Sequence, residues 1–120
     1  MAQLFTNNAH SLIEGGGISD TDTSLTITAD TGDRFPSPTG SDYFLLTLIG
    51  IDGDGLEDTW EIVKCTTRAG DVITIERAQE DTVALAWGAA LRVELRVTAG
   101  SVNAMIAATK KAKTLALAGL

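Results

Sequence analysis

The sequence predicts a mainly β protein: a small antiparallel β-sandwich or barrel with a C-terminal α-helix. Three observations predict it: short runs rich in β-branched residues, Gly, Pro and Asp turns between them, and a change to helical spacing near the C-terminus. The 120 residues, of which 44% are hydrophobic, suit one domain with one core. We expect an N-terminal arm at residues 1–17, a β-domain at residues 18–100 and a helix at residues 101–120.

The N-terminal arm is predicted to be irregular. Asn7, Asn8 and the three glycines at residues 15–17 break regular structure. Residues 10–14 have room for one helical turn at most.

Two strands are expected in the first half of the β-domain. Residues 24–28 alternate polar and apolar side chains, the period-two pattern of a half-buried strand. Residues 43–49 are a nearly continuous apolar run, whose short length and aromatic and branched side chains favour a buried strand. Pro36 and Pro38 indicate a loop between the two strands, because proline donates no backbone hydrogen bond.

Three more strands are expected in the second half. Residues 60–67 and 72–77 flank a turn at Gly70 and Asp71, which is the pattern of a β-hairpin. Residues 90–97 then alternate, with Leu and Val on one side and Arg and Glu on the other.

The last segment is predicted to be a helix. Thr98 or Ser101 can cap it, because a hydroxyl accepts a hydrogen bond from a free amide of the first turn. Three lysines in the later turns suit the negative end of the helix dipole. An apolar stripe of mostly small side chains recurs at helical spacing, and such a helix needs a surface on which to lie. The stripe comprises Val102, Met105, Ile106, Thr109, Ala112 and Ala116.

Composition and charge exclude several classes of partner. The formal net charge of −7 argues against nucleic acid and anionic lipid as partners. The N-terminus has no secretory signal pattern, and no apolar run approaches the ~20 residues that span a bilayer, so we expect a soluble chain made in the cytoplasm. Cys65 is the single cysteine, and its strand-like surroundings favour a small buried hydrophobic residue.

Candidate sites for chemistry are weak, and we predict no catalytic, cofactor-binding or metal-binding residue. His10 and Cys65 form a nucleophile–base pair only in principle, because no third group is identifiable to orient them. The acidic turn at residues 52–58 offers carboxylates to a cation such as calcium, but its spacing departs from the EF-hand, and a solvated turn is favoured. Trp60 and Trp87 are interpreted as core or interface anchors, with a carbohydrate-stacking platform as the alternative.

The order of motifs along residues 3–103 resembles the N-terminal virion-attachment domain of tailed-bacteriophage tail fibres and related tail proteins. Each motif is weak alone, but their order and spacing together are specific. The motifs are Leu-Phe-Thr-Asn-Asn-Ala at residues 4–9, Leu-Thr-Ile at 25–27, Arg-Phe-Pro-Ser-Pro at 34–38, Asp-Tyr-Phe at 42–44, Glu-Ile-Val-Lys at 61–64, Thr-Arg-Ala-Gly-Asp at 67–71, Glu-Arg-Ala-Gln-Glu-Asp-Thr at 76–82, Ala-Trp at 86–87 and Arg-Val-Glu-Leu-Arg-Val-Thr-Ala-Gly at 92–100.

The resemblance implies a non-enzymatic structural protein of a phage virion, an adaptor or anchor in the tail, baseplate or fibre-attachment region. It implies that residues 61–68 and 72–77 are structural strands, and that residues 76–80 are the family's signature turn, with Ala78 where glycine is often found. Other virion proteins and further copies of the chain are the expected partners. A fibre would continue into a shaft, whereas this sequence stops after one helix, which favours an adaptor.

Subunit association is the predicted mechanism. The arm, the loop around the prolines and the helix are expected to offer apolar contacts to neighbouring subunits. The expected contact residues are Leu4, Phe5, Phe35, Tyr43, Val102, Met105 and Ile106. The helix is expected to pack on its own sheet or on another chain. The alternatives are a capsid decoration or neck protein, and a carbohydrate-binding module that recognises the host surface.

Overall fold

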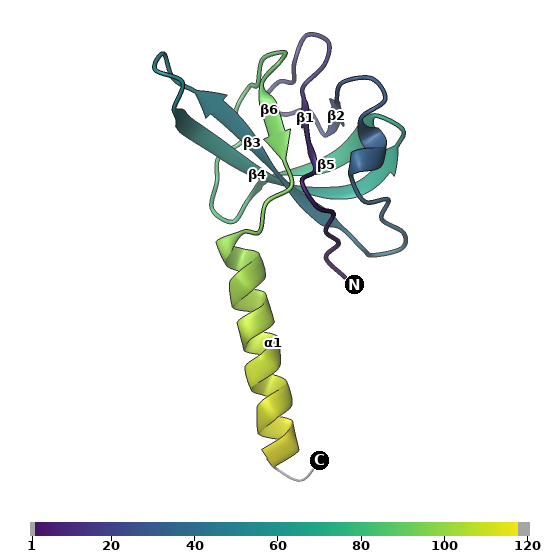
Figure 1. The fold of residues 1–120 in the computed structure, drawn as a ribbon, viewed down its shortest axis with the longest axis vertical. Coiled ribbons are helices and arrows are strands. Elements are labelled where there is room, and N and C mark those ends of the chain that lie inside the picture. The colour runs from purple at the N-terminus through teal and green to yellow at the C-terminus, as the bar shows by residue number, and fades with distance from the viewer. Residues whose placement is uncertain (1, 118–120) are drawn as a thin grey trace.

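The computed structural model describes residues 2–117, which form one six-stranded antiparallel sheet followed by a helix (Figure 1). The order of strands across the sheet is β1-β6-β3-β4-β5-β2. The elements are β1 (His10–Leu12), β2 (Ser24–Thr26), a 3-10 turn (Gly32–Arg34), β3 (Phe44–Ile51), β4 (Glu57–Ala69), β5 (Val72–Gln79), β6 (Arg92–Glu94) and α1 (Ala99–Leu117). The predicted mainly β class with a C-terminal helix is confirmed.

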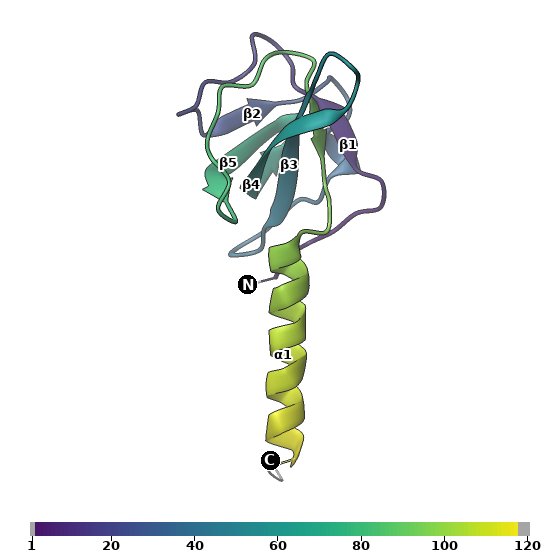
Figure 2. The same ribbon diagram turned by 90° about the vertical axis from the view of Figure 1, so that its left-hand side faces the viewer.

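The sheet curls into a half-barrel, and its two edges approach one another (Figure 2). Ile13 and Ile27 form an isolated antiparallel bridge just beyond the edge strands β1 and β2. Beside it, the Glu14 amide donates to the Thr26 carbonyl at 2.9 Å and the Thr28 amide donates to the Leu12 carbonyl at 3.0 Å. These bonds satisfy backbone groups that an open sheet edge would leave exposed.

Several strand boundaries differ from those predicted. The expectation of a helical turn at residues 10–14 is wrong, because His10–Leu12 pairs with β6 as strand β1. Strand β4 is longer than residues 60–67, because the β3–β4 hairpin continues outward to a pair between Ile51 and Glu57. Strands β2 and β6 are each three residues long, shorter than the alternating runs that predicted them.

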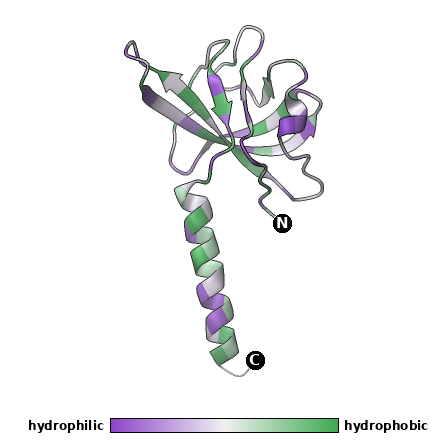
Figure 3. Cartoon of the chain, in the orientation of Figure 1, coloured by the Kyte–Doolittle hydropathy of each residue, from purple (hydrophilic) through white to green (hydrophobic). Residues whose placement is uncertain are grey.

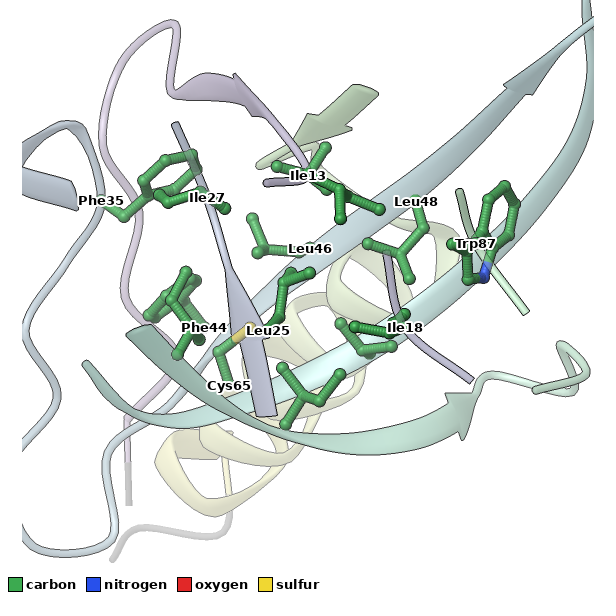
Figure 4. Packing of buried hydrophobic residues seen from close by; sticks show 14 of the residues in the cluster. Ile13, Ile18, Leu25, Ile27, Phe35, Phe44, Leu46, Leu48, Cys65 and Trp87 are labelled. Atoms are coloured by element: carbon green, nitrogen blue, oxygen red, sulfur yellow. The ribbon is translucent and has the colours of Figure 1, made fainter. Parts of the chain in front are cut away.

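The concave side of the curled sheet encloses the hydrophobic core (Figure 4). Alternate residues of the long strands point inward, as period-two patterning requires. The ring of Phe35 stacks on Phe44 at a centroid distance of 6.2 Å, and Trp87 lies at the opposite end of the cluster. Cys65 is fully buried between them, so the prediction of a small buried hydrophobic residue is confirmed. The fully buried apolar side chains of this cluster are Leu25, Ile27, Phe44, Leu46, Leu48, Val63, Cys65, Ile73, Ile75 and Val93.

Candidate functional site

Helix α1 projects away from the β-domain (Figures 1 and 2). Ser101 is its buried residue, and every residue from 102 to 117 is exposed. The 19 residues of α1 reach about 28 Å at ~1.5 Å per residue. The helix therefore does not pack on its own sheet, which was one of the two surfaces expected for it. In proteins most of the stability of a helix comes from packing its apolar face, and α1 does not pack that face on the β-domain, so α1 is the candidate association surface.

The apolar stripe predicted on α1 faces solvent. Val102, Met105 and Ile106 are 37%, 57% and 47% exposed, respectively. With Thr109 and Lys110 they line a shallow apolar groove on the helix. Figure 3 shows hydrophobic residues in the first half of α1, hydrophilic residues after them, and hydrophobic residues again at the end.

A network of hydrogen bonds fixes the start of α1 to the β-domain. The Thr98 hydroxyl accepts from the Ser101 amide at 3.1 Å, which makes Thr98 the cap out of the two residues predicted. Thr98 also donates to the carboxylate of Glu80, and that carboxylate accepts from the Gly100 amide at 2.8 Å. The Gln3 side-chain amide donates to the Ser101 hydroxyl at 2.7 Å. A carboxylate at a helix N-terminus also interacts favourably with the helix dipole.

The chain bends sharply where it presents Glu80 to the helix. Ala78, Glu80 and Asp81 have φ values of 53°, 53° and 64°, in the left-handed region. Glycine reaches this region without steric cost, whereas a side chain with Cβ is strained there. The positive φ at position 78 therefore favours glycine there, whereas this chain has alanine.

The N-terminal arm and Tyr43 lie at the root of α1. The Leu4 amide donates to the Tyr43 carbonyl at 2.7 Å, and the Tyr43 amide donates to the Ala2 carbonyl at 3.0 Å. The Lys64 ammonium lies 4.8 Å from the centre of the Tyr43 ring, in cation–π distance. Together with Ser101 and Ala104 these segments border a hollow of ≈ 290 Å³. The structure thus brings Tyr43 and the arm, predicted separately, next to the helix.

The other predicted contact residues divide between surface and core. Phe5 is 44% exposed, and Leu4 packs in part against the core. Phe35 is only 2% exposed because its ring completes the core against Phe44. The expectation that Phe35 offers an exposed contact is therefore corrected: the prolines that follow it indicated a surface loop, but the loop folds its aromatic ring inward.

Glu61 is a fully buried carboxylate in β4 that sequence reasoning missed. Arg77 of β5 donates to both of its oxygens, from Nε at 2.8 Å and from Nη2 at 2.9 Å. The indole of Trp87 donates at 2.8 Å, and the backbone amides of Leu85 and Ala78 donate at 3.0 and 3.1 Å. Burial alone raises the pKa of Glu61, but the hydrogen bonds, chiefly from Arg77 and Trp87, outweigh burial and lower the pKa below its ordinary value.

Arg77 connects this carboxylate to the loops around it. Its guanidinium donates to the carbonyls of Ser19 at 2.6 Å, Asp22 at 3.0 Å and Leu85. Four separate segments therefore converge on one buried ion pair. This arrangement orders the loops that cover the Trp87 end of the core.

A second ion cluster covers the outer face of the sheet. Glu57 accepts from Arg96 at 2.9 Å and from Arg92 at 3.1 Å, and the Trp60 indole donates to it at 2.8 Å. The hydrogen bond from Arg96, followed by that from Trp60, lowers the pKa of Glu57 to about 2. Glu94 lies 3.0 Å from the same Arg96 guanidinium. These side chains are partly exposed, so the cluster contributes less to stability than the buried pair.

The weak candidates for chemistry are not assembled into a site. Cys65 is buried, and burial raises the pKa of its thiol well above the ordinary value, which disfavours the nucleophilic thiolate. Within residues 2–117, no group of three or more His, Cys, Asp or Glu side chains is arranged to hold a metal ion. In the acidic turn, Asp52 Oδ1 instead accepts from the amides of Asp54 at 2.8 Å and Leu56 at 2.9 Å. Trp87 is buried while Trp60 is 46% exposed, so the two do not form a joint stacking platform.

The alternation of side chains along β4 and β5 indicates that Glu61 and Arg77 point inward. Glu61 precedes Val63 and Cys65 at period two, and Arg77 follows Ile73 and Ile75 in the same way. A charged residue on each inward face of two neighbouring strands is the pattern of a buried ion pair. The donors from residues 78–87 depend on tertiary folding and left no comparable pattern.

No protein-family model matches the chain, and no curated protein matches it at a significant level. Among residues 2–117, no helix is both long and apolar enough to cross a membrane.

Proposed function

We propose that this chain is a non-enzymatic structural protein of a tailed-phage virion. It acts as an adaptor or anchor in the tail, baseplate or fibre-attachment region, and it works by association with other virion proteins and with further copies of itself. The order of motifs along the β-domain supports the phage assignment. The exposed helix α1, held by its capped start, is the observation that carries the mechanism.

The contrast in exposure supports association as the mechanism. The β-domain encloses its own core, whereas the helix leaves large apolar side chains in water, Leu117 at 85% exposure among them. Burying such side chains against a partner is favourable by about 25 cal/mol per Å². A partner for α1 therefore stabilises both the helix and the assembly.

Particles purified from the phage that encodes the chain test the proposal. Mass spectrometry should find the chain in these particles, and cryo-electron microscopy should locate it at the tail with a copy number set by tail symmetry. A copy number that follows the capsid lattice would instead support a decoration protein. Absence of the chain from assembled particles would contradict the proposal.

Paired variants test the mechanism separately. Met105→Glu places a charge on the stripe, whereas Asn103→Glu places the same charge on the polar side of the helix. We expect Met105→Glu to reduce incorporation into particles at least tenfold and Asn103→Glu to leave it nearly unchanged. Equal incorporation of both variants would show that α1 is not the association surface.

A further inference from the structure

The side chains along the α1 stripe decrease in size from the start of the helix to its end. Val102, Met105 and Ile106 are large, whereas Thr109, Ala112 and Ala116 are small. Positions 102, 105, 109, 112 and 116 follow alternating steps of three and four, the spacing of a seam between two packed helices. The occupant of this seam must therefore be small where α1 is large, and large where it is small.

Orientation decides whether a second α1 fits this seam. In a parallel pair, large side chains meet at one end and alanines at the other, so the helices are forced apart at one end or leave a void at the other. In an antiparallel pair centred on Thr109, Val102 lies opposite Ala116, Ile106 opposite Ala112 and Met105 opposite Lys113. The two branched side chains then meet alanines, and the flexible stem of Lys113 lies along Met105 with its ammonium in water.

Charge favours the same orientation. Helix α1 contains Lys110, Lys111, Lys113 and no acidic residue. The other parts of the chain hold six basic and sixteen acidic residues, a formal charge of −10. Parallel pairing would place six lysines side by side with no acid on either helix. Antiparallel pairing moves each lysine cluster toward the acidic β-domain of the other copy.

The distances suit this attraction. With the pair centred on Thr109, Lys113 of one helix lies opposite Met105 of the other, six residues from Ala99. Six residues correspond to about 9 Å of helix. That separation is close to the screening length of ~8 Å at physiological ionic strength, so the negative charge of the β-domain attracts the lysines with only partial screening. The two helix dipoles also oppose one another in this arrangement.

The shape of the molecule leaves room for the pair. The β-domain lies at one end of α1 only (Figures 1 and 2), so antiparallel helices keep the two domains at opposite ends. Leu117 of one copy then lies level with Ser101 of the other, at the start of the second helix.

We propose that α1 pairs antiparallel with α1 of a second copy, with the two helices centred on Thr109 and the two β-domains at opposite ends. The pairing rests on the association mechanism of the proposed function, and it names the partner as a second copy of the same chain.

Cysteine cross-linking of the full chain tests the orientation. Val102→Cys and Ala116→Cys are made as separate variants, and Cys65 is retained because it is buried. Under mild oxidation, an equal mixture of the two should yield a covalent dimer with one copy of each, and neither variant alone should yield one. Asn103→Cys mixed with Ala116→Cys is the matched control and should remain uncross-linked.

The outcomes separate this proposal from the proposed function. A covalent dimer of Val102→Cys alone would show parallel helices and overturn the proposal. Failure of the mixture to cross-link, together with a monomer of the unmodified chain in sedimentation velocity, would overturn it as well. Both sites are exposed, so the substitutions do not disturb the core. Detection of the chain in phage particles tests the function independently of either result.

Discussion

Strand β3 and helix α1 place similar side chains in opposite surroundings. Leu46 and Leu48 of β3 are fully buried, whereas Met105 and Ile106 of α1 are 57% and 47% exposed. The β-domain also supplies partners for its buried charges, and no buried side-chain N or O atom in the described part of the chain lacks a hydrogen bond. The β-domain thus buries its own apolar side chains and satisfies its buried polar groups, while α1 leaves its apolar stripe exposed.

Under the proposed function, folding and association depend on separate residues. The residues that stabilise the β-domain are buried, and the exposed residues of the α1 stripe contribute little to that domain. Mutations in the two regions should therefore affect different measurements: unfolding of the domain in one case, and assembly in the other.

The largest effect is expected from Arg77→Ala. Removal of the guanidinium leaves Glu61 as a buried carboxylate without its cation, and breaking a buried pair in this way costs about 3–5 kcal/mol. Urea unfolding followed by tryptophan fluorescence, to which the buried Trp87 contributes, measures the loss. Arg96→Ala is the control, because its partner Glu57 is partly exposed, and we expect less than about 1 kcal/mol there. Equal losses would contradict the distinct role of the buried pair.

Paired truncations sharpen the comparison between core and helix. Leu46→Ala leaves a cavity in the core and should lower the free energy of unfolding by about 2–5 kcal/mol. Met105→Ala removes a side chain that faces water in the monomer, so unfolding of the dilute β-domain should change by less than about 0.5 kcal/mol. The same urea titration measures both variants. A large loss for Met105→Ala at low concentration would show that the helix belongs to the folded domain.

A smaller and opposite effect is expected at the turn that holds Glu80. Ala78→Gly relieves the strain of φ 53° and should raise stability by about 0.5 kcal/mol after the entropy of glycine is counted. Ala69→Gly at the end of β4 is the matched control and should lower stability by about 0.5–1 kcal/mol, because glycine weakens a strand. The shift of the thermal midpoint reports the sign in each case. Destabilisation by Ala78→Gly would contradict the strain argument.

The smallest effect on stability is expected from the partly exposed cluster around Glu57, and it depends on pH. The pKa of Glu57 in the folded chain is about 2, against an ordinary value of 4.5. The depressed pKa means that the carboxylate stabilises the fold above pH 4.5, and that this contribution is lost as pH falls toward 2. A carbon NMR titration should follow Glu57 with a midpoint near 2, and Arg96→Ala should raise that midpoint. Arg34→Ala, which removes a guanidinium bonded to the His10 carbonyl, should leave it unchanged.

Sequence patterns predicted the long strands and the helix because their periods are local. The hairpin of β4 and β5 and the helix capped at Thr98 follow directly from alternation, turn residues and a hydroxyl before an apolar stripe. Strand β1 was missed because three residues between Asn and Gly segments carry no period, and only the pairing with β6 makes them a strand.

The polar centre of the fold was not predicted for a different reason. Glu61 was interpreted within a structural strand without regard to its charge, and its donors come from four positions between residues 77 and 87. Phe35 was placed in an exposed loop because of the neighbouring prolines, whereas contact with Phe44 makes it part of the core. Strand alternation indicates the inward positions of Glu61 and Arg77, but the other donors to Glu61 and the contact between Phe35 and Phe44 depend on tertiary folding, which local patterns do not encode.

Hydrogen exchange at two protein concentrations tests most directly that α1 needs a partner while the β-domain does not. We predict that the amides of residues 102–117 exchange rapidly in dilute protein and become protected as the concentration rises, with protection of β3, β4 and β5 unchanged. Strong protection of α1 at the lowest concentration, or none at any concentration, would contradict the account.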